Sequence, residues 1–92
     1  MASYQVAVLP EAEEDLEALD PPIRNRCLAK IEWLAAHPEV LGKKPLHNVP
    51  VALRGLQSYT VGDWRILYWV YPVERCLKIY GVQHRSQVYK HL

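Results

Sequence analysis

Strand-like runs fill the carboxyl-terminal half of this 92-residue chain and limit the folds it can adopt. Trp64–Tyr71 and Cys76–Gln83 are rich in Val, Ile, Tyr and Trp, and the short segment Pro72–Arg75 separates them. Short β-branched and aromatic runs bounded by turn residues are typical of antiparallel hairpins. A further run, Val51–Val61, ends at the turn Gly62-Asp63. We therefore predict an antiparallel meander of three strands.

The amino-terminal half predicts one strand and two helices. Tyr4–Leu9 is rich in Val and alternates loosely, as a strand does. Pro10 suits a first helical turn, and the acidic residues after it favour the positive end of the helix dipole. Asp20-Pro21-Pro22 ends this helix and starts a second one, which His37-Pro38 ends because the residue before proline avoids the helical region. Apolar residues recur at helical spacing along the second helix, at Ile23, Cys27, Ile31 and Leu34.

The predicted element order is β-α-α-β-β-β in a single α+β domain over residues 1–92. The two helices cannot bury their apolar stripes alone, so we expect an α-hairpin packed on one face of the sheet. We expect Tyr4–Leu9 at a sheet edge, antiparallel to Val51–Val61. The opposite sheet face is expected to stay open to a partner.

Composition favours a globular protein of the cell interior. Half of the residues are hydrophobic and 23% are charged, and no apolar run approaches the roughly 20 residues of a membrane span. Met1–Leu9 lacks the features of a signal peptide, so a cytoplasmic location is expected. Cys27 and Cys76 have no Cys, His or acidic neighbours at metal-ligand spacing. We interpret both cysteines as buried thiols and expect no metal site.

The net charge of +1 conceals an asymmetry between the two halves. Residues 1–53 carry five basic and eight acidic side chains, whereas residues 54–92 carry six basic and two acidic ones. The halves therefore differ in sign, at −3 and +4, and the molecule can present a cationic face to a polyanion such as RNA. The alternative is that six scattered cations only keep a sheet soluble, and charge alone does not decide between the two.

Strand alternation predicts an aromatic surface around Arg65. Its neighbours at every second position of the strand are Leu67, Trp69 and Tyr71, while the next strand places Lys78, Tyr80 and Val82 on one side. Guanidinium groups stack on aromatic rings and bind phosphate oxygens through two parallel hydrogen bonds. The alternative for Arg65 is an ion pair with Asp63 or Glu74 at the edge of the sheet.

Three residues just after the last strand could act on a phosphodiester. RNA cleavage without a metal needs a base for the 2′-hydroxyl, an acid for the leaving 5′-oxygen, and cations to stabilise the phosphate. Histidine as a residue type can serve as acid or base, which makes His84 a candidate for proton transfer, and Arg85 can hold a phosphate. Tyr89 is a poor base, with a pKa of about 10, unless cations stabilise its phenolate. The same three residue types also occur in small domains with no such activity, so the cluster alone is a weak signal.

Three segments together resemble the RelE/ParE superfamily of toxins from type II toxin–antitoxin systems. They are Leu53-Arg54-Gly55-Leu56, Val61-Gly62-Asp63-Trp64-Arg65-Ile66-Leu67-Tyr68 and Gly81-Val82-Gln83-His84-Arg85-Ser86-Gln87-Val88-Tyr89. The resemblance covers nearly the whole chain and includes the element order. RelE-like members are ribosome-dependent endoribonucleases that cut mRNA without a metal or cofactor. The resemblance implies a cognate antitoxin as a partner, with the ribosome and mRNA as targets.

The resemblance also implies roles for individual residues. Arg65 would clamp the phosphate or the transition state, and Tyr89 would be the base, with Arg85 and His84 assisting charge and proton transfer. Arg54, Lys78 and Lys90 would contact RNA.

The chain departs from the RelE pattern at three positions. Leu56 and Ser58 stand where lysines are expected, and Gln83 stands where a cation is expected. ParE-like relatives share the scaffold, inhibit DNA gyrase and lack the catalytic set. A gyrase inhibitor, or an inactive relative that only binds an antitoxin, is therefore the alternative to a nuclease.

Overall fold

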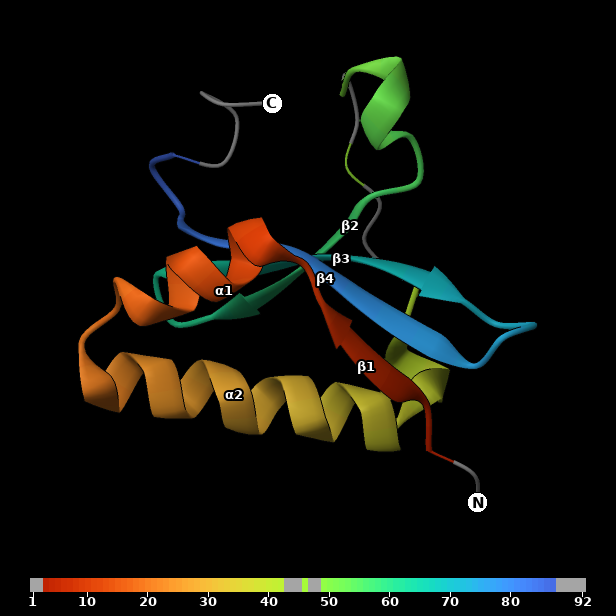
Figure 1. Ribbon diagram of the computed structural model, residues 1–92, viewed down its shortest axis with the longest axis horizontal. Coiled ribbons are helices and arrows are strands. Elements are labelled where there is room, and N and C mark those ends of the chain that lie inside the picture. Colours follow the sequence, from red (N-terminus) through yellow and green to blue (C-terminus); the bar gives the residue numbers. More distant parts are fainter. Residues whose placement is uncertain (1–2, 43–45, 47–48, 88–92) are drawn as a thin grey trace.

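The computed structural model describes residues 3–42, 46 and 49–87, and it has the predicted α+β element order. The strand β1 precedes the helices α1 and α2, and the strands β2, β3 and β4 follow them (Figure 1). The bounds are β1 Gln5–Val8, α1 Pro10–Glu17, α2 Pro21–Ala36, β2 Gln57–Val61, β3 Trp64–Tyr71 and β4 Cys76–His84. Two short 3-10 helices, η1 (Pro38–Val40) and η2 (Val51–Leu53), lie in the connection between α2 and β2.

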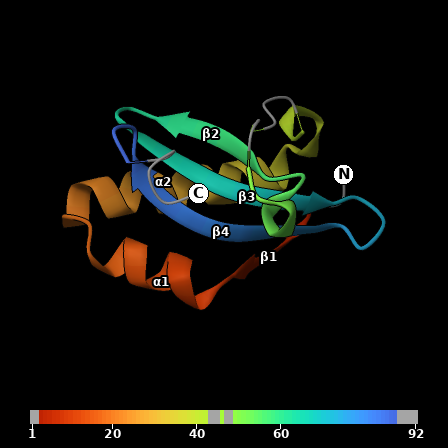
Figure 2. The same ribbon diagram turned by 90° about the horizontal axis from the view of Figure 1, so that it is seen from above.

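The position of β1 differs from the prediction. The order of the sheet is β1-β4-β3-β2, and β1 pairs in parallel with β4, so the sheet is mixed (Figure 2). The expected antiparallel pairing of β1 with Val51–Val61 is therefore wrong. The helices and the long connection carry the chain from one edge of the sheet to the other. The strands β2, β3 and β4 then lie side by side in this order, so that β4 lies next to β1.

The strand β2 is shorter than predicted because the backbone turns before it. Val51–Leu53 forms the 3-10 helix η2, and Gly55 has a φ of 87°. Such a positive φ is incompatible with an extended strand and favours glycine. Regular pairing with β3 begins only at Gln57, so the predicted strand Val51–Val61 is reduced to its second half.

Prolines start both helices, as the sequence predicts, and an arginine joins them. Pro10 and Pro21 occupy first-turn positions, where the missing N–H would be unpaired in any case. The Arg24 side chain donates hydrogen bonds of 2.8 to 3.0 Å to the carbonyl oxygens of Leu16, Glu17 and Leu19. These carbonyls lie at the end of α1, where helical partners run out. Arg24 thus caps α1 and fixes the hairpin.

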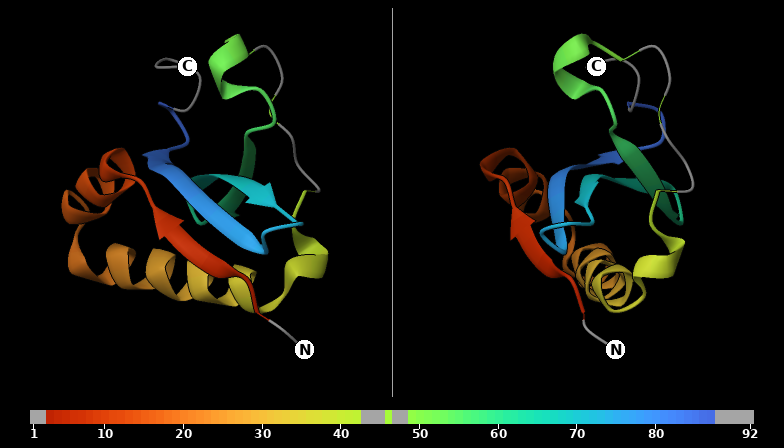
Figure 3. Two further views of the ribbon diagram at one scale, coloured as in Figure 1. Left: turned by 45° about the vertical axis from the view of Figure 1, so that its right-hand side comes forward. Right: turned by 90° about the vertical axis from the view of Figure 1, so that its right-hand side faces the viewer.

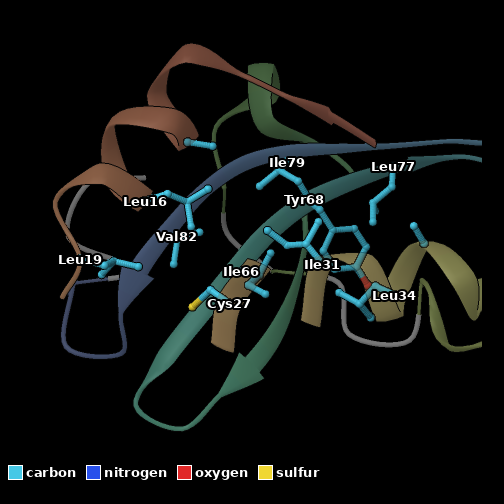
Figure 4. Packing of buried hydrophobic residues seen from close by; sticks show 12 residues of the cluster. Leu16, Leu19, Cys27, Ile31, Leu34, Ile66, Tyr68, Leu77, Ile79 and Val82 are labelled. Atoms are coloured by element: carbon cyan, nitrogen blue, oxygen red, sulfur yellow. The ribbon is translucent and has the colours of Figure 1, made fainter. Parts of the chain in front are cut away.

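The main core lies between the sheet and the two helices (Figure 4). Its fully buried members include Cys27 and Leu34 of α2, Ile66 and Tyr68 of β3, and Ile79 of β4. The predicted α2 stripe is confirmed, since its positions face this core. Burial raises the pKa of the Cys27 thiol and of the Tyr68 phenol above their ordinary values of 9.0 and 10.0, so both groups stay neutral at physiological pH.

An irregularity in the β3–β4 ladder changes the face on which later β4 residues lie. Leu67 pairs with Gly81 rather than with Tyr80, so β4 carries one extra residue at this point. Simple alternation predicts Val82 on the same face as Lys78 and Tyr80. That prediction is wrong, because Val82 is buried in the core beneath the helices.

A carboxylate of α1 is hydrogen-bonded to β4 beside this irregularity. The backbone N–H of Val82 donates to Asp15 Oδ2 at 3.0 Å, across 67 residues of sequence. A Cβ added at Gly81 would lie 3.0 Å from the same oxygen, which is too close for an unadjusted side chain. Glycine at position 81 therefore lets α1 approach β4 closely enough to make the bond.

We expect Leu34→Ala to lower the free energy of unfolding by about 2–5 kcal/mol, because Leu34 is fully buried and its loss leaves a cavity. Urea denaturation followed by tryptophan fluorescence measures the change. Leu28→Ala is the matched control, since Leu28 is 41% exposed on the same helix and its truncation should stay within about 0.5 kcal/mol. Equal costs at both positions would contradict the assignment of the buried face.

We expect Asp15→Ala to lower the free energy of unfolding by about 1.5–3 kcal/mol, because it removes a charged acceptor and leaves the Val82 N–H unpaired. Asp15→Asn keeps an oxygen at the acceptor position and should cost less. Exchange of the Val82 amide proton, followed by NMR, should accelerate in the alanine variant and much less in the asparagine variant. Unchanged protection in the alanine variant would rule out the bond as a tie between α1 and β4.

Candidate nucleic-acid interface

The face of the sheet that points away from α1 and α2 is here called the open face (Figure 3). It carries the rings of Trp69 and Tyr80. Trp69 and Leu67 of β3 belong to a second apolar cluster that is separate from the main core. Tyr80 of β4 packs with them, and its ring lies edge-on to Trp69 at 5.3 Å between centroids. Alternation along β3 places Arg65 on this same face.

The connection before β2 covers part of the open face, which the sequence did not predict. Leu46 and Leu56 from this connection are buried against Leu67 of the sheet. The indole Nε1 of Trp69 donates a hydrogen bond of 3.2 Å to the carbonyl oxygen of Arg54, which holds the connection in place. The uncovered part of the open face is therefore narrower than the whole sheet.

Arg65 lies at one end of the open face between two uncharged residues. It is half-buried and pairs with Thr60 of β2 and Gln83 of β4. Across the described residues, the ion pair with Asp63 belongs to Arg85, and no carboxylate lies within 4 Å of the Arg65 guanidinium. The alternative of an ion-paired Arg65 is thus not seen in this part of the chain. A guanidinium without a carboxylate partner is available to an anionic ligand.

Gln83 is a neighbour of Arg65 that was not predicted from the sequence. Its Oε1 atom is buried and accepts no hydrogen bond from the residues that the structure describes. Counting back from the β3–β4 turn pairs Arg65 with Val82, and the extra residue near Tyr80 shifts that partner to Gln83. The only sequence signal was the hairpin register, and it misleads by one residue.

His84 lies on the other face from Arg65. It pairs with Trp64, whose ring packs against the main core, and the two rings meet edge-on at 5.2 Å. Its Nδ1 lies 2.9 Å from Ser86 Oγ. His84 also lines a pocket of about 350 Å³ beside α1, together with Asp15 and the adjacent Gln83. The structure therefore does not place the His84 ring beside the Arg65 guanidinium.

Arg85 lies at the surface just beyond β4. Its backbone N–H donates to the Asp63 carbonyl oxygen at 2.8 Å, and its Nε lies 3.8 Å from Asp63 Oδ1. Both side chains are about two-thirds exposed, at 69% and 66%, so this ion pair is weak and a phosphate can compete for the guanidinium.

The remaining predicted cations lie toward the other end of the open face. Lys78 pairs with Trp69, and its Nζ lies 5.1 Å from the centre of the Tyr71 ring. Arg54 is exposed and lies next to Trp69 through its carbonyl oxygen. Four positions along β3, or roughly 13 Å, separate Trp69 from Arg65. The predicted residues Tyr89 and Lys90 lie outside the described residues.

The described residues contain no group of three or more His, Cys, Asp or Glu side chains that could hold a metal ion. No helix in the same part of the chain has the length and apolar character needed to cross a membrane. The open face carries a half-buried Arg65 at one end and aromatic rings with Lys78 and Arg54 toward the other, and Arg85 lies exposed just beyond β4. This arrangement can bind phosphates and stack bases.

Comparisons with known proteins agree with the fold. Residues 6–89 match the family described as the ParE toxin of the type II toxin–antitoxin system parDE. Toxin RelE of Mycobacterium tuberculosis is 33% identical over 88 residues, which span 95% of this chain and 87% of that protein.

Solved structures show the same arrangement of elements. The toxin–antitoxin complex RelBE2 of M. tuberculosis contains a chain with a TM-score of 0.73 and 30% identity, and the match covers 94% of this chain and 95% of that one. An archaeal RelE–RelB complex from Pyrococcus horikoshii gives a TM-score of 0.69 at 22% identity, with 95% and 100% covered. At that identity the likeness supports the fold alone.

The fold and these matches define a toxin of a type II toxin–antitoxin system. The chain belongs to the ParE toxin family, within the RelE/ParE superfamily.

Proposed function

We propose that this toxin is a ribosome-dependent endoribonuclease that cuts mRNA. The observation that carries the proposal is the half-buried Arg65 on the open face, which has no carboxylate within 4 Å among the described residues. A cation without a carboxylate partner, on a sheet face that carries aromatic rings farther along, suits a nucleic-acid strand whose phosphate binds the cation and whose bases stack on the rings. The RelE relative of M. tuberculosis, at 33% identity, favours the same reading.

In the proposed reaction, the 2′-hydroxyl attacks the adjacent phosphate and the 5′-oxygen leaves. Arg65 and Arg85 stabilise the charge that develops on the phosphate oxygens. Tyr89 takes the proton of the 2′-hydroxyl, and the positive charges of Arg65 and Arg85 stabilise the phenolate form of Tyr89 that accepts it. The RNA backbone extends along the open face to Arg54 and Lys78, with Lys90 as a further contact. No metal or cofactor takes part in these steps.

His84 has a restricted part in this proposal. Its ring lies on the helical side of β4, with Trp64, and only an RNA strand that bends around the end of β4 reaches both His84 and Arg65. Proton delivery to the leaving oxygen is then the step that His84 can serve, since this oxygen lies away from the attacking group. An imidazole ring can donate a proton to a leaving oxygen, which suits that role.

The proposed partner in the resting cell is a cognate antitoxin. The structurally similar chains of M. tuberculosis and P. horikoshii are each found in a complex of the RelB–RelE type. We place the toxin in the cytoplasm, where ribosomes and mRNA are its targets.

Inhibition of DNA gyrase is the second candidate function. The separation of His84 from Arg65 favours it, because it weakens the set of groups needed for cleavage. The absence of lysines at Leu56 and Ser58 points the same way, and these two residues are in fact buried. The matched family model is itself that of the ParE toxin. An inactive relative that only binds an antitoxin would have neither activity.

We expect Arg65→Ala to reduce mRNA cleavage by at least about 100-fold, because it removes a cation that acts on the transition state. The measurement incubates purified toxin with translating ribosomes and maps the 3′ ends of the mRNA. Arg75→Asn is the matched control: it removes an exposed cation from the β3–β4 turn, and asparagine tolerates the left-handed φ of 52° found there. The control should cleave like the wild type.

Melting temperatures accompany these assays. A loss of cleavage in Arg65→Ala together with a drop of many degrees would assign Arg65 to the fold rather than to the reaction. Intact message with the wild-type toxin refutes the nuclease, and gyrase supercoiling assays with the same preparation then test the second function. A wild-type toxin without either effect would be the inactive relative.

A further inference from the structure

The strand β1 forms one edge of the sheet, and among the described residues it pairs with β4 alone. Figures 2 and 3 show no described helix or loop along its outer side. Val6 of this strand is 40% exposed although it is apolar. The unpaired N–H and C=O groups of such an edge are a template for another strand.

Val6 and Val8 carry the backbone groups that point away from β4. The N–H groups of Gln5 and Leu9 donate hydrogen bonds of 2.9 and 3.0 Å to carbonyl oxygens on the β4 side. Backbone groups alternate in direction along a strand, so those of Val6 and Val8 point outward. Outside the pairing of β1 with β4, neither residue makes a backbone hydrogen bond to another described residue.

The strand β1 lacks the features by which natural edge strands avoid pairing. Its sequence, Gln-Val-Ala-Val, contains neither a charged residue nor a proline. Its backbone is regular, since none of its residues has a positive φ. Charges, prolines and bulges are the usual protection of an edge, and the only protective feature here is a short length of four residues.

The outward groups of β1 are complementary to those of a second copy in one register. In an antiparallel pair of β1 strands with its two-fold axis at Ala7, Val6 of each copy lies opposite Val8 of the other and exchanges two hydrogen bonds with it. An axis at Val6 would need the N–H of Tyr4, which already donates to a carbonyl oxygen of α2 at 2.8 Å. An axis at Val8 would need an N–H from Pro10, which has none.

The side chains suit the same register. Val8 packs against the main core, and alternation places Val6 on the same face of the sheet. Each pair would set the exposed Val6 against a valine at the rim of the partner's core, which removes apolar surface from water. On the other face the small Ala7 of each copy meets its equivalent, at the close spacing of a pair without hydrogen bonds.

Charge favours a second copy over a polyanion at this edge. Exposed acidic residues of α1 flank the Val8 end of β1, namely Glu11, Glu13 and Glu14. The other end adjoins the β3–β4 turn, where Gln5 is bonded to the Arg75 carbonyl oxygen. Two-fold symmetry brings the acidic end of one copy toward the Arg75 end of the other, an attraction that Glu74 of the same turn partly offsets. RNA or an acidic peptide would instead meet the carboxylates of α1.

We propose that two copies of this chain associate through β1, in an antiparallel pair centred on Ala7 that joins their sheets edge to edge. Because two short strands make the contact, the dimer is weak, with a Kd on the order of 100 µM. The pairing lies in the plane of the sheet and leaves the open face uncovered. The inference therefore does not depend on whether the toxin cleaves RNA or inhibits gyrase.

Sedimentation equilibrium of the purified toxin from about 10 µM to about 1 mM measures this association. Val6→Lys should raise the Kd about tenfold or more, because it sets a cation against an apolar contact and the backbone edge. Val51→Lys is the matched control, since it makes the same change at a side chain of η2 that is 76% exposed and lies away from β1. The control should associate like the wild type, and circular dichroism confirms that both variants are folded.

Ala7→Cys tests the register of the pair. Across the two-fold axis the introduced thiols would face each other at a Cα separation of about 4.5 Å, which a disulfide can span. Mild oxidation should therefore give a covalent dimer, and mass spectrometry should find the disulfide between position 7 of the two copies. The wild type, with Cys27 and Cys76, and Val51→Cys are the controls, and both should give far less covalent dimer.

Three outcomes would overturn the inference. The first is a wild type that stays monomeric over this range, with no disulfide at position 7 in Ala7→Cys. The second is a dimer that Val6→Lys leaves intact and that forms no such disulfide, since its interface lies elsewhere. The third is slowed hydrogen exchange at Val6 and Val8 that occurs only with a co-purified protein, which assigns the edge to that protein. None of them changes the expected result of the cleavage assay.

Discussion

The double pairing of β4 is the constraint on which the rest of this structure depends. It is bonded in parallel to β1 on one side and antiparallel to β3 on the other, so both of its backbone edges are used. Its Val82 N–H also binds Asp15 of α1, which ties the helical hairpin to the centre of the sheet. Shifting β4 would therefore move a strand, a helix and the open face together.

One extra residue in β4 decides which side chains meet on each face. Without it, alternation from the β3–β4 turn would place Val82 and His84 on the face of Lys78 and Tyr80. The irregularity at Leu67 sends Val82 into the core, brings Gln83 beside Arg65 and turns His84 toward Trp64. The core gains an apolar residue, and the candidate site has an amide where the hairpin register would place Val82.

Local signals in the sequence predicted the elements, and long-range pairing was beyond them. Prolines mark the starts of both helices because they fix φ, and the spacing of Cys27, Ile31 and Leu34 reports the buried face of α2. The neighbour of β1 depends on a contact across more than 70 positions, for which a single sequence has no local signature. The same holds for Leu46 and Leu56, which cover part of the open face.

The sequence predicted which β3 residues share a face with Arg65, but it did not predict on which face His84 lies. Alternation along β3 places Arg65 on the face of Trp69 and Tyr71, because no irregularity interrupts that strand on its own. The grouping of His84 with Arg65 followed from closeness in sequence, and two residues adjacent to a strand end can point to opposite sides of a sheet.

The parallel pairing of β1 with β4 has a consequence for biosynthesis. A ribosome makes β1 about 70 residues before it makes the partner of this strand, β4. Until then the apolar sides of the helices and of β1 have only part of their sheet to pack on. The sheet can thus close only after β4 has been made, and an interrupted translation product that lacks β4 has neither a closed core nor the surface that carries Gln83 and Lys78.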